Sequence, residues 1–112
     1  MPGYLAAAQE ISDQVLSWPG STAHVHRFGG IEFRLGNRQL GHLHGDRTAD
    51  IPLTRSLRDE LVAAGRVRIH CWRPDSGWVT VDIDSDDGRD EAVRLLRVGY
   101  DSAVRAAERR QS

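Results

Sequence analysis

Two histidines, His42 and His44, stand one residue apart in a stretch whose pattern is typical of a β-strand. Side chains along a strand point alternately to its two faces, so both imidazoles are predicted to lie on the same face. Asp46 follows at once, and His70 has the same predicted orientation in a later strand. Imidazole is the side chain that exchanges protons and binds metals near neutral pH. These residues therefore predict a functional face on a sheet, although they do not identify a substrate.

Two kinds of chemistry are open to this group. His44 with Asp46, or His42 with Asp50, could form a general base and the carboxylate that orients it. Alternatively, His42 and His44 could supply two ligands to a divalent metal, with His70 or Asp46 as a third. Neither a G-x-S-x-G motif nor a cysteine–histidine signature occurs, which argues against covalent nucleophilic catalysis. We assign His42, His44 and Asp46 to the catalytic role and expect neither a metal nor a cofactor.

The elements that must position these residues follow from hydrophobic periodicity and from turn residues. Apolar residues recur every three or four positions near both ends of the chain, which predicts amphipathic helices. Alternating stretches between them, separated by glycines and prolines, predict antiparallel strands. The predicted elements are a helix over 5–18, strands over 23–28, 31–35 and 39–44, a short helix from 54 or 56 to 64, strands over 66–72 and 77–83, and a helix over 89–109.

This order, α-β-β-β-α-β-β-α, predicts one α+β domain over residues 1–112, with its core between about 5 and 107. The sheet is expected to have five mostly antiparallel strands, and the N- and C-terminal helices are expected to pack on one face of it. The stretch 45–49 is expected to be a loop.

The face of the sheet opposite the helices is expected to carry unusual side chains. Alternation in the last two strands places Ile69 and Cys71 in the core and His70, Trp72 and Trp78 on the open face. Open faces of antiparallel sheets are normally plainly polar, so tryptophans beside histidines indicate a binding surface.

The third strand allows two orientations. If Leu43 belongs to the core, His42 and His44 join the open face, whereas a core Leu40 would turn both histidines under the helices. We favour the first, because burying two imidazoles beside aliphatic side chains costs free energy unless each is hydrogen-bonded.

Composition narrows the class of protein. The chain has 15 basic residues, all arginine, and 16 acidic residues, so its net charge of −1 argues against a dominant nucleic-acid footprint. No apolar run is long enough to cross a membrane, and the N-terminus lacks the features of a signal peptide. A lone cysteine, Cys71, excludes an internal disulfide, and we expect a cytoplasmic protein with this thiol buried and inert.

Several short motifs resemble the small luciferase domain family of actinobacterial and fungal proteins. They are Gly-His-Leu-His-Gly-Asp at 41–46, Ala-Asp-Ile-Pro-Leu at 49–53, Arg-Asp at 58–59, the histidine at 70 and Pro-Asp-Ser-Gly-Trp at 74–78. The resemblance covers about residues 15–105 and departs from the usual motif at Leu53, where phenylalanine is usual. It implies an α+β domain and draws attention to His42, His44, Asp46, Asp50, Arg55, Asp59, His70, Ser76 and Trp78. More distantly, the layout is similar to the MmcQ/YjbR-like fold, which has a strand-borne tryptophan before a closing helix that contains a tyrosine.

We therefore predict that the open face binds a small polar or anionic ligand, with acid–base chemistry as a further possibility. Trp72 and Trp78 would supply apolar walls, and Arg55 and His70 would supply polar anchors. The ligand-binding residues that we predict are Asp50, Arg55, His70, Trp72, Ser76 and Trp78. Two other functions stay open: a nucleic-acid-binding module that uses the arginines and tryptophans of the last two strands, and a homodimer closed by the aromatic face, with structural histidines.

Overall fold

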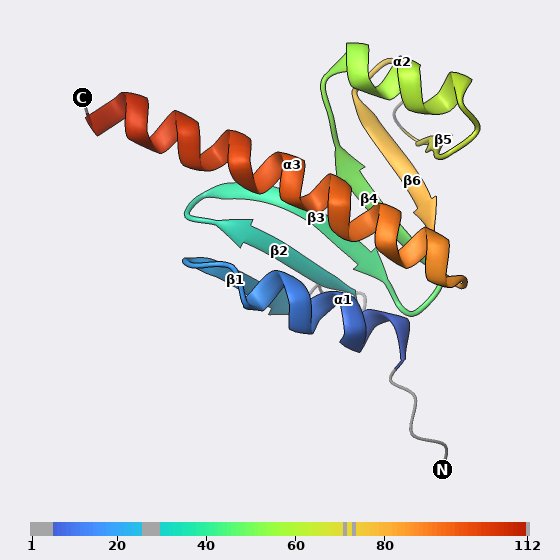
Figure 1. Cartoon of the computed structure of the whole chain (residues 1–112), viewed down its shortest axis with the longest axis horizontal. Helices are drawn as coiled ribbons and strands as arrows, with labels where there is room; N and C mark the ends of the chain where they lie inside the picture. The colour runs from blue at the N-terminus through green and yellow to red at the C-terminus, as the bar shows by residue number, and fades with distance from the viewer. Residues whose placement is uncertain (1–5, 26–29, 71, 73, 112) are drawn as a thin grey trace.

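Three helices and a six-stranded sheet make up the part of the chain that the computed structural model describes, residues 6–25, 30–70, 72 and 74–111 (Figure 1). Neighbouring strands are antiparallel throughout, in the order β1-β2-β3-β4-β6-β5. The elements are α1 (Ala7–Leu16), β1 (Ser21–Val25), β2 (Ile31–Leu35), β3 (Arg38–His44), β4 (Thr48–Pro52), α2 (Arg55–Ala63), β5 (Arg68–Ile69), β6 (Trp78–Asp82) and α3 (Asp86–Gln111).

The predicted α+β class is confirmed, but the sheet has one strand more than predicted. The stretch 45–49, expected to be a loop, is a tight turn over 45–47 that leads into β4 at Thr48, and β4 pairs with β3 on one side and β6 on the other. Strand β4 is short and ends at Pro52, so its sequence gives little alternation to detect. Ala49 and Ile51 are nevertheless fully buried, opposite Val81 and Val79 of β6.

The predicted strand 66–72 was wrong in extent. It shortens to the two-residue β5, and Ile69, expected in the core, is 43% exposed. Cys71 lies outside the described residues, as do residues 26–28 of the predicted first strand. Helix α2 begins and ends close to the prediction, with the Thr54 hydroxyl accepting the Leu57 N–H and with Gly65 at a φ of +73° after its end.

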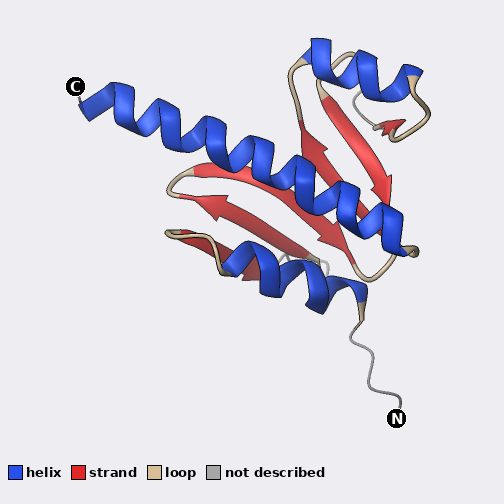
Figure 2. Cartoon of the chain, in the orientation of Figure 1, coloured by secondary structure: helices blue, strands red, loops and turns tan. Residues whose placement is uncertain are grey.

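Helices α1 and α3 cover one face of the sheet, as predicted (Figure 2). The long helix α3 crosses β3, β4 and β6, while α1 packs on β1 and against α3. The core is made of aliphatic side chains from both layers, among them Ile11, Val15, Phe33, Leu43, Ile51, Val79, Val81, Leu95 and Leu96. None of the helices in the described part of the chain is long and apolar enough to cross a membrane.

A β-bulge in β3 decides which way the histidines face. Phe33 of β2 lies opposite Gly41, but its neighbour Arg34 lies opposite Gln39, so Leu40 is an extra residue in β3. The extra residue lets both Leu40 and Leu43 face the core, each 1% exposed. The histidines therefore lie on the open face, although the sequence suggested that only one of the two leucines could be a core residue.

Gly41 makes this bulge possible. Its φ is +155°, and a Cβ atom placed there would lie 2.8 Å from Leu96 Cδ2 and 2.9 Å from the Asp50 carbonyl oxygen. A side chain at this position would push β3 away from α3 and from β4.

We expect Gly41→Ala to lower the free energy of unfolding by about 2–3 kcal/mol, because the added methyl group is both strained and overpacked. The matched control is Gly99→Ala in α3, where a Cβ atom would meet its nearest neighbours at an ordinary 3.9 Å. The free energy of unfolding of this control should rise by up to about 1 kcal/mol, because alanine has a higher helix propensity than glycine. Urea unfolding followed by circular dichroism measures both, and a Gly41→Ala variant as stable as the wild type would contradict this account of the bulge.

Candidate functional site: a carboxylate under three histidines

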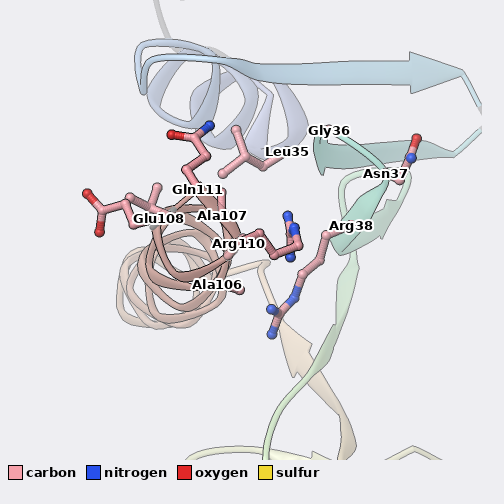
Figure 3. A pocket seen from close by; sticks show the side chains of 11 residues that line it. Leu35, Gly36, Asn37, Arg38, Ala106, Ala107, Glu108, Arg110 and Gln111 are labelled. Carbon is pink, nitrogen blue, oxygen red and sulfur yellow. The ribbon is translucent and has the colours of Figure 1, made fainter.

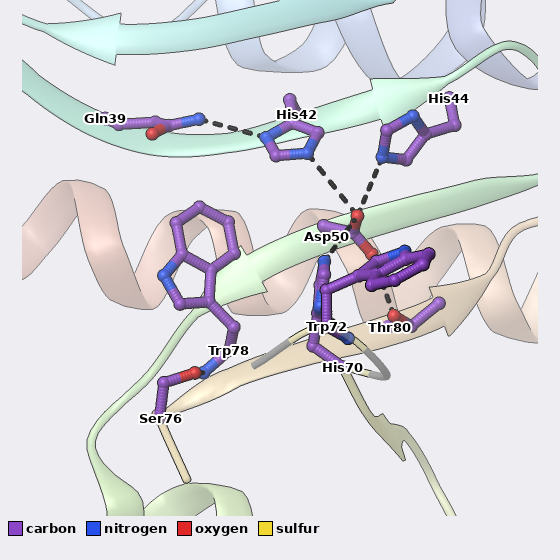
Figure 4. Close-up of polar contacts among 9 residues, drawn as sticks. All are labelled: Gln39, His42, His44, Asp50, His70, Trp72, Ser76, Trp78 and Thr80. Carbon is purple, nitrogen blue, oxygen red and sulfur yellow. Dashed lines mark hydrogen bonds and ion pairs between the residues drawn. The ribbon is translucent and has the colours of Figure 1, made fainter. Parts of the chain in front are cut away.

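The open face is organised around Asp50, a carboxylate in β4 that is only 4% exposed. Its Oδ2 atom lies 2.7 Å from Nε2 of His44, 3.2 Å from Nε2 of His70 and 3.4 Å from Nε2 of His42 (Figure 4). Its Oδ1 atom accepts a hydrogen bond of 2.8 Å from the Thr80 hydroxyl. Three imidazoles thus converge on a single oxygen atom.

Strand pairing brings these residues together. In the antiparallel ladders His42 lies opposite Asp50, and Asp50 lies opposite Thr80, so one residue from each of β3, β4 and β6 shares the same row. His44 is the next residue of β3 on that face. His70 follows β5, where its backbone N–H donates to the Trp78 carbonyl oxygen at 3.3 Å.

The pKa of Asp50 is held below its ordinary value of 3.8. Burial alone would raise this pKa, because it penalises the charged form. The hydrogen bonds from His42, Thr80 and His44, together with the electrostatic interaction with His70, outweigh burial and favour the carboxylate. Asp50 is therefore an anion at neutral pH.

The other ring nitrogens show where the histidines keep their protons. The Gln39 side-chain amide donates to Nδ1 of His42 at 3.0 Å, and the Trp72 backbone N–H donates to Nδ1 of His70 at 3.1 Å. Because these Nδ1 atoms accept, both rings carry their proton on Nε2 and direct it at Asp50. His44 differs, since its side chain is 56% exposed and the contacts of the described residues leave its Nδ1 atom open to a ligand.

Trp78 forms a wall beside the histidines. Its ring centroid lies 5.5 Å from that of His42 and 6.3 Å from that of His70. Ser76 accepts the Trp78 backbone N–H with its hydroxyl oxygen at 3.1 Å. The carbonyl groups of Ser76 and Pro74 accept hydrogen bonds from Arg58 in α2, which holds this loop in place.

Three of the predicted site residues lie apart from this cluster. The Asp46 carboxylate accepts the Ala8 backbone N–H at 2.9 Å, so it stabilises the start of α1. Arg55 is exposed at the first turn of α2, and none of the described contacts joins it to the histidines. The Trp72 side chain is 85% exposed, and its link to the site is its backbone amide. Of the two predicted pairings, the structure forms that of His42 with Asp50, at 3.4 Å, but the shortest contact of Asp50 with a histidine, at 2.7 Å, is with His44, a pairing that was not predicted.

Gln39 is a site residue that the sequence did not reveal. It shares a face with His42 because of the extra residue at Leu40, and no pattern in the sequence shows that bulge.

His42, His44 and Asp50 could also hold a metal ion, because one ligand atom from each lies within 4.8 Å of the others. A metal would take the place of the protons on both Nε2 atoms. In this structure the Gln39 amide nitrogen faces Nδ1 of His42, and a metal on Nε2 of that ring would require the amide to present its oxygen there instead.

Two of the cavities that adjoin the sheet border the start of β3. The larger, of about 820 Å³, lies between the β2–β3 turn and the C-terminal part of α3, and none of the predicted site residues lines it (Figure 3). The second, of about 530 Å³, is lined in part by Gln39 and Trp78, the two residues that flank His42.

An antiparallel sheet with helices on one face and a histidine–carboxylate cluster on the other defines an α+β domain with an open-face polar site. Residues 37–99 match the luciferase domain family, over more than half of the chain and across the whole cluster. The chain therefore belongs to this family, as its motifs predicted. Neither the curated proteins nor the solved structures gave a significant match. The similarity to the MmcQ/YjbR-like fold stays a prediction.

We expect Asp50→Asn to lower the free energy of unfolding by about 2–3 kcal/mol at about pH 8, because an amide cannot accept from all the donors that surround this carboxylate. Since the pKa of Asp50 is lowered, its stabilisation is present above the ordinary value of 3.8 and is lost as the pH falls below it. The difference in the free energy of unfolding between the wild type and Asp50→Asn should therefore become smaller below about pH 4. Urea unfolding over a range of pH measures it.

The matched control for this measurement is Asp82→Asn. Asp82 lies on β6 and forms an exposed ion pair of 2.6 Å with Arg68, so its loss should cost less than about 1 kcal/mol. An Asp50→Asn variant that behaves like this control at every pH would contradict the central role of Asp50.

Proposed function

We propose that the protein binds a small polar or anionic ligand on its open sheet face and that His44 exchanges a proton with that ligand. The observation that carries this proposal is the convergence of three imidazoles on Asp50, with Nδ1 engaged in two of them and open in the exposed third. Such a fixed hydrogen bond between a buried carboxylate and an exposed imidazole is what a general base needs.

The chemistry follows from the tautomer of His44. Its Nε2–H donates to Asp50, which leaves the lone pair on Nδ1 to take a proton from an acidic O–H, N–H or C–H group of the ligand. The imidazolium that results keeps its Nε2–H on the carboxylate, and Asp50 stabilises the new positive charge. Return of the proton to the same atom, to another atom of the ligand or to water restores the neutral ring.

Arg66 and Arg68, two of the arginines on which the nucleic-acid hypothesis depends, favour a small ligand over a nucleic acid. Arg68 on the open face forms an ion pair with Asp82, and Arg66 forms one with Glu91. Their charges are already balanced by carboxylates, whereas binding to phosphates draws on unbalanced cations. The exposed Trp72 ring leaves a homodimer as a further prediction.

We expect the wild-type protein to speed hydrogen–deuterium exchange at C3 of phenylpyruvate, a small anion with an acidic C–H group, when nuclear magnetic resonance follows the reaction in deuterated buffer. General bases contribute about 10²–10⁴-fold, so His44→Gln should return exchange to the rate of buffer alone. Asp50→Asn should slow it at least about tenfold, because a neutral amide stabilises the imidazolium less than a carboxylate does.

The matched control is His24→Gln on β1, where an exposed imidazole contacts Thr22 and no carboxylate among its described contacts. This variant should exchange phenylpyruvate at the wild-type rate. Exchange no faster than in buffer, or exchange that survives in His44→Gln, would refute proton transfer by His44.

We further expect protein purified without chelators to contain less than one equivalent of any transition metal by elemental mass spectrometry. Exchange of phenylpyruvate should then be unchanged by added chelator. If the wild type contains stoichiometric metal and the His42→Ala/His44→Ala double variant does not, the histidine cluster is a metal site and the proposal of metal-free proton transfer is refuted.

A further inference from the structure

A groove opens in the sheet where β3 and β4 cease to pair. Their ladder has three pairs, from His44↔Thr48 to His42↔Asp50. Before His42, β3 continues back to Arg38, and beyond Asp50, β4 runs on to Pro52 beside β6, so the two strands diverge there (Figure 1). The cavity of about 530 Å³ fills this gap, with α3 as its floor and α2 at its side.

The walls of this groove are largely apolar, and one end borders the histidines. Leu40, Leu53, Leu57 and Val98 line it from four different elements or loops. Gln39 and Trp78 line it as well, and these are the residues that contact His42 in Figure 4. A molecule lying in the groove would therefore lie beside His42, the neighbour of His44.

Positive charge at the groove has no carboxylate to balance it. Arg38 and Arg105 line the groove, and no aspartate or glutamate does so. The Arg38 guanidinium donates to the hydroxyl of Ser102 at 3.2 Å, which is a neutral partner. Elsewhere in the described part of the chain, arginines such as Arg97 are paired with carboxylates, and none of those ion pairs includes Arg38 or Arg105.

We propose that this groove binds the apolar body of a ligand that carries a carboxylate, with Arg38 and Arg105 binding the carboxylate. Guanidinium groups bind carboxylates through two parallel hydrogen bonds, and the leucine walls beside the two exposed arginines would bury the apolar body of the ligand. The inference rests on the proposed function, because it names the class of ligand whose other end reaches the histidines. An amphiphilic organic acid satisfies both parts of the site.

A matched pair of probes tests whether the negative charge of the ligand contributes to binding in the groove. We expect 2-naphthoate to bind, with amide shifts in nuclear magnetic resonance spectra that concentrate at Leu57, Gly99 and Ser102. The alcohol 2-naphthalenemethanol has the same ring system without the charge and should bind at least about tenfold more weakly. Equal affinities for the two probes, shifts outside the groove, or no binding of naphthoate at millimolar concentration would each overturn the proposal.

Variants then test the two arginines. The Arg38→Gln/Arg105→Gln double variant should bind naphthoate about as weakly as the wild type binds the alcohol. The control is Arg94→Gln, on the same helix but outside the groove and paired with Glu91, and it should bind naphthoate as the wild type does. Naphthoate affinity that is unchanged in the double variant would overturn the role of the arginines.

The two proposals fail in distinguishable ways. If naphthoate affinity depends on the two arginines but phenylpyruvate exchange does not depend on His44, the proposal of a carboxylate-binding groove is supported and the proposal of proton transfer by His44 is refuted. If phenylpyruvate exchange depends on His44 but naphthoate affinity does not depend on the arginines, proton transfer is supported and the carboxylate-binding groove is refuted.

Discussion

The buried carboxylate of Asp50 is the constraint on which the open face depends. A charge removed from water is tolerated only where donors surround it, and here four donors come from β3, β6 and the segment after β5. Those donors reach Asp50 only if β4 lies between β3 and β6 in one particular register, since a shift by one residue would turn Asp50 into the core. The need to satisfy one anion thus fixes the order of three strands.

The same constraint explains the unusual start of β3. The extra residue at Leu40 lets two leucines reach the core while Gln39 stays on the face of His42. The Gln39 amide then fixes the tautomer of that imidazole, and Gly41 allows the backbone to pass close to Asp50 and α3. A bulge beside a functional site commonly redirects a side chain in this way. Here it supplies the donor that keeps His42 directed at the carboxylate.

Periodicity predicted the three helices, the antiparallel pairing and the orientation of the histidines, because each depends on where apolar side chains recur along the chain. It missed β4, because this strand has only two core-facing residues, Ala49 and Ile51, and ends in Pro52. Periodicity also could not show whether Asp46 or Asp50 contacts the histidines. Asp46 is nearer to His44 in sequence, but the turn carries it to α1, while pairing brings Asp50 back across the hairpin. The contact between Gln39 and His42 could not be predicted, because it depends on a bulge that no local sequence pattern reveals.

The end of the β3–β4 ladder joins the two halves of the candidate site. Where pairing stops, the sheet can no longer close over α3, and the gap becomes a cavity whose border residues also contact His42. The family match runs from residue 37 to residue 99, so it contains the carboxylate, the three histidines and the apolar walls of the groove. Ser102 and Arg105 lie beyond it on α3. We therefore expect the histidine cluster and the apolar walls to be common to the family, and the contribution of Arg105 to the carboxylate-binding end to be where its members differ.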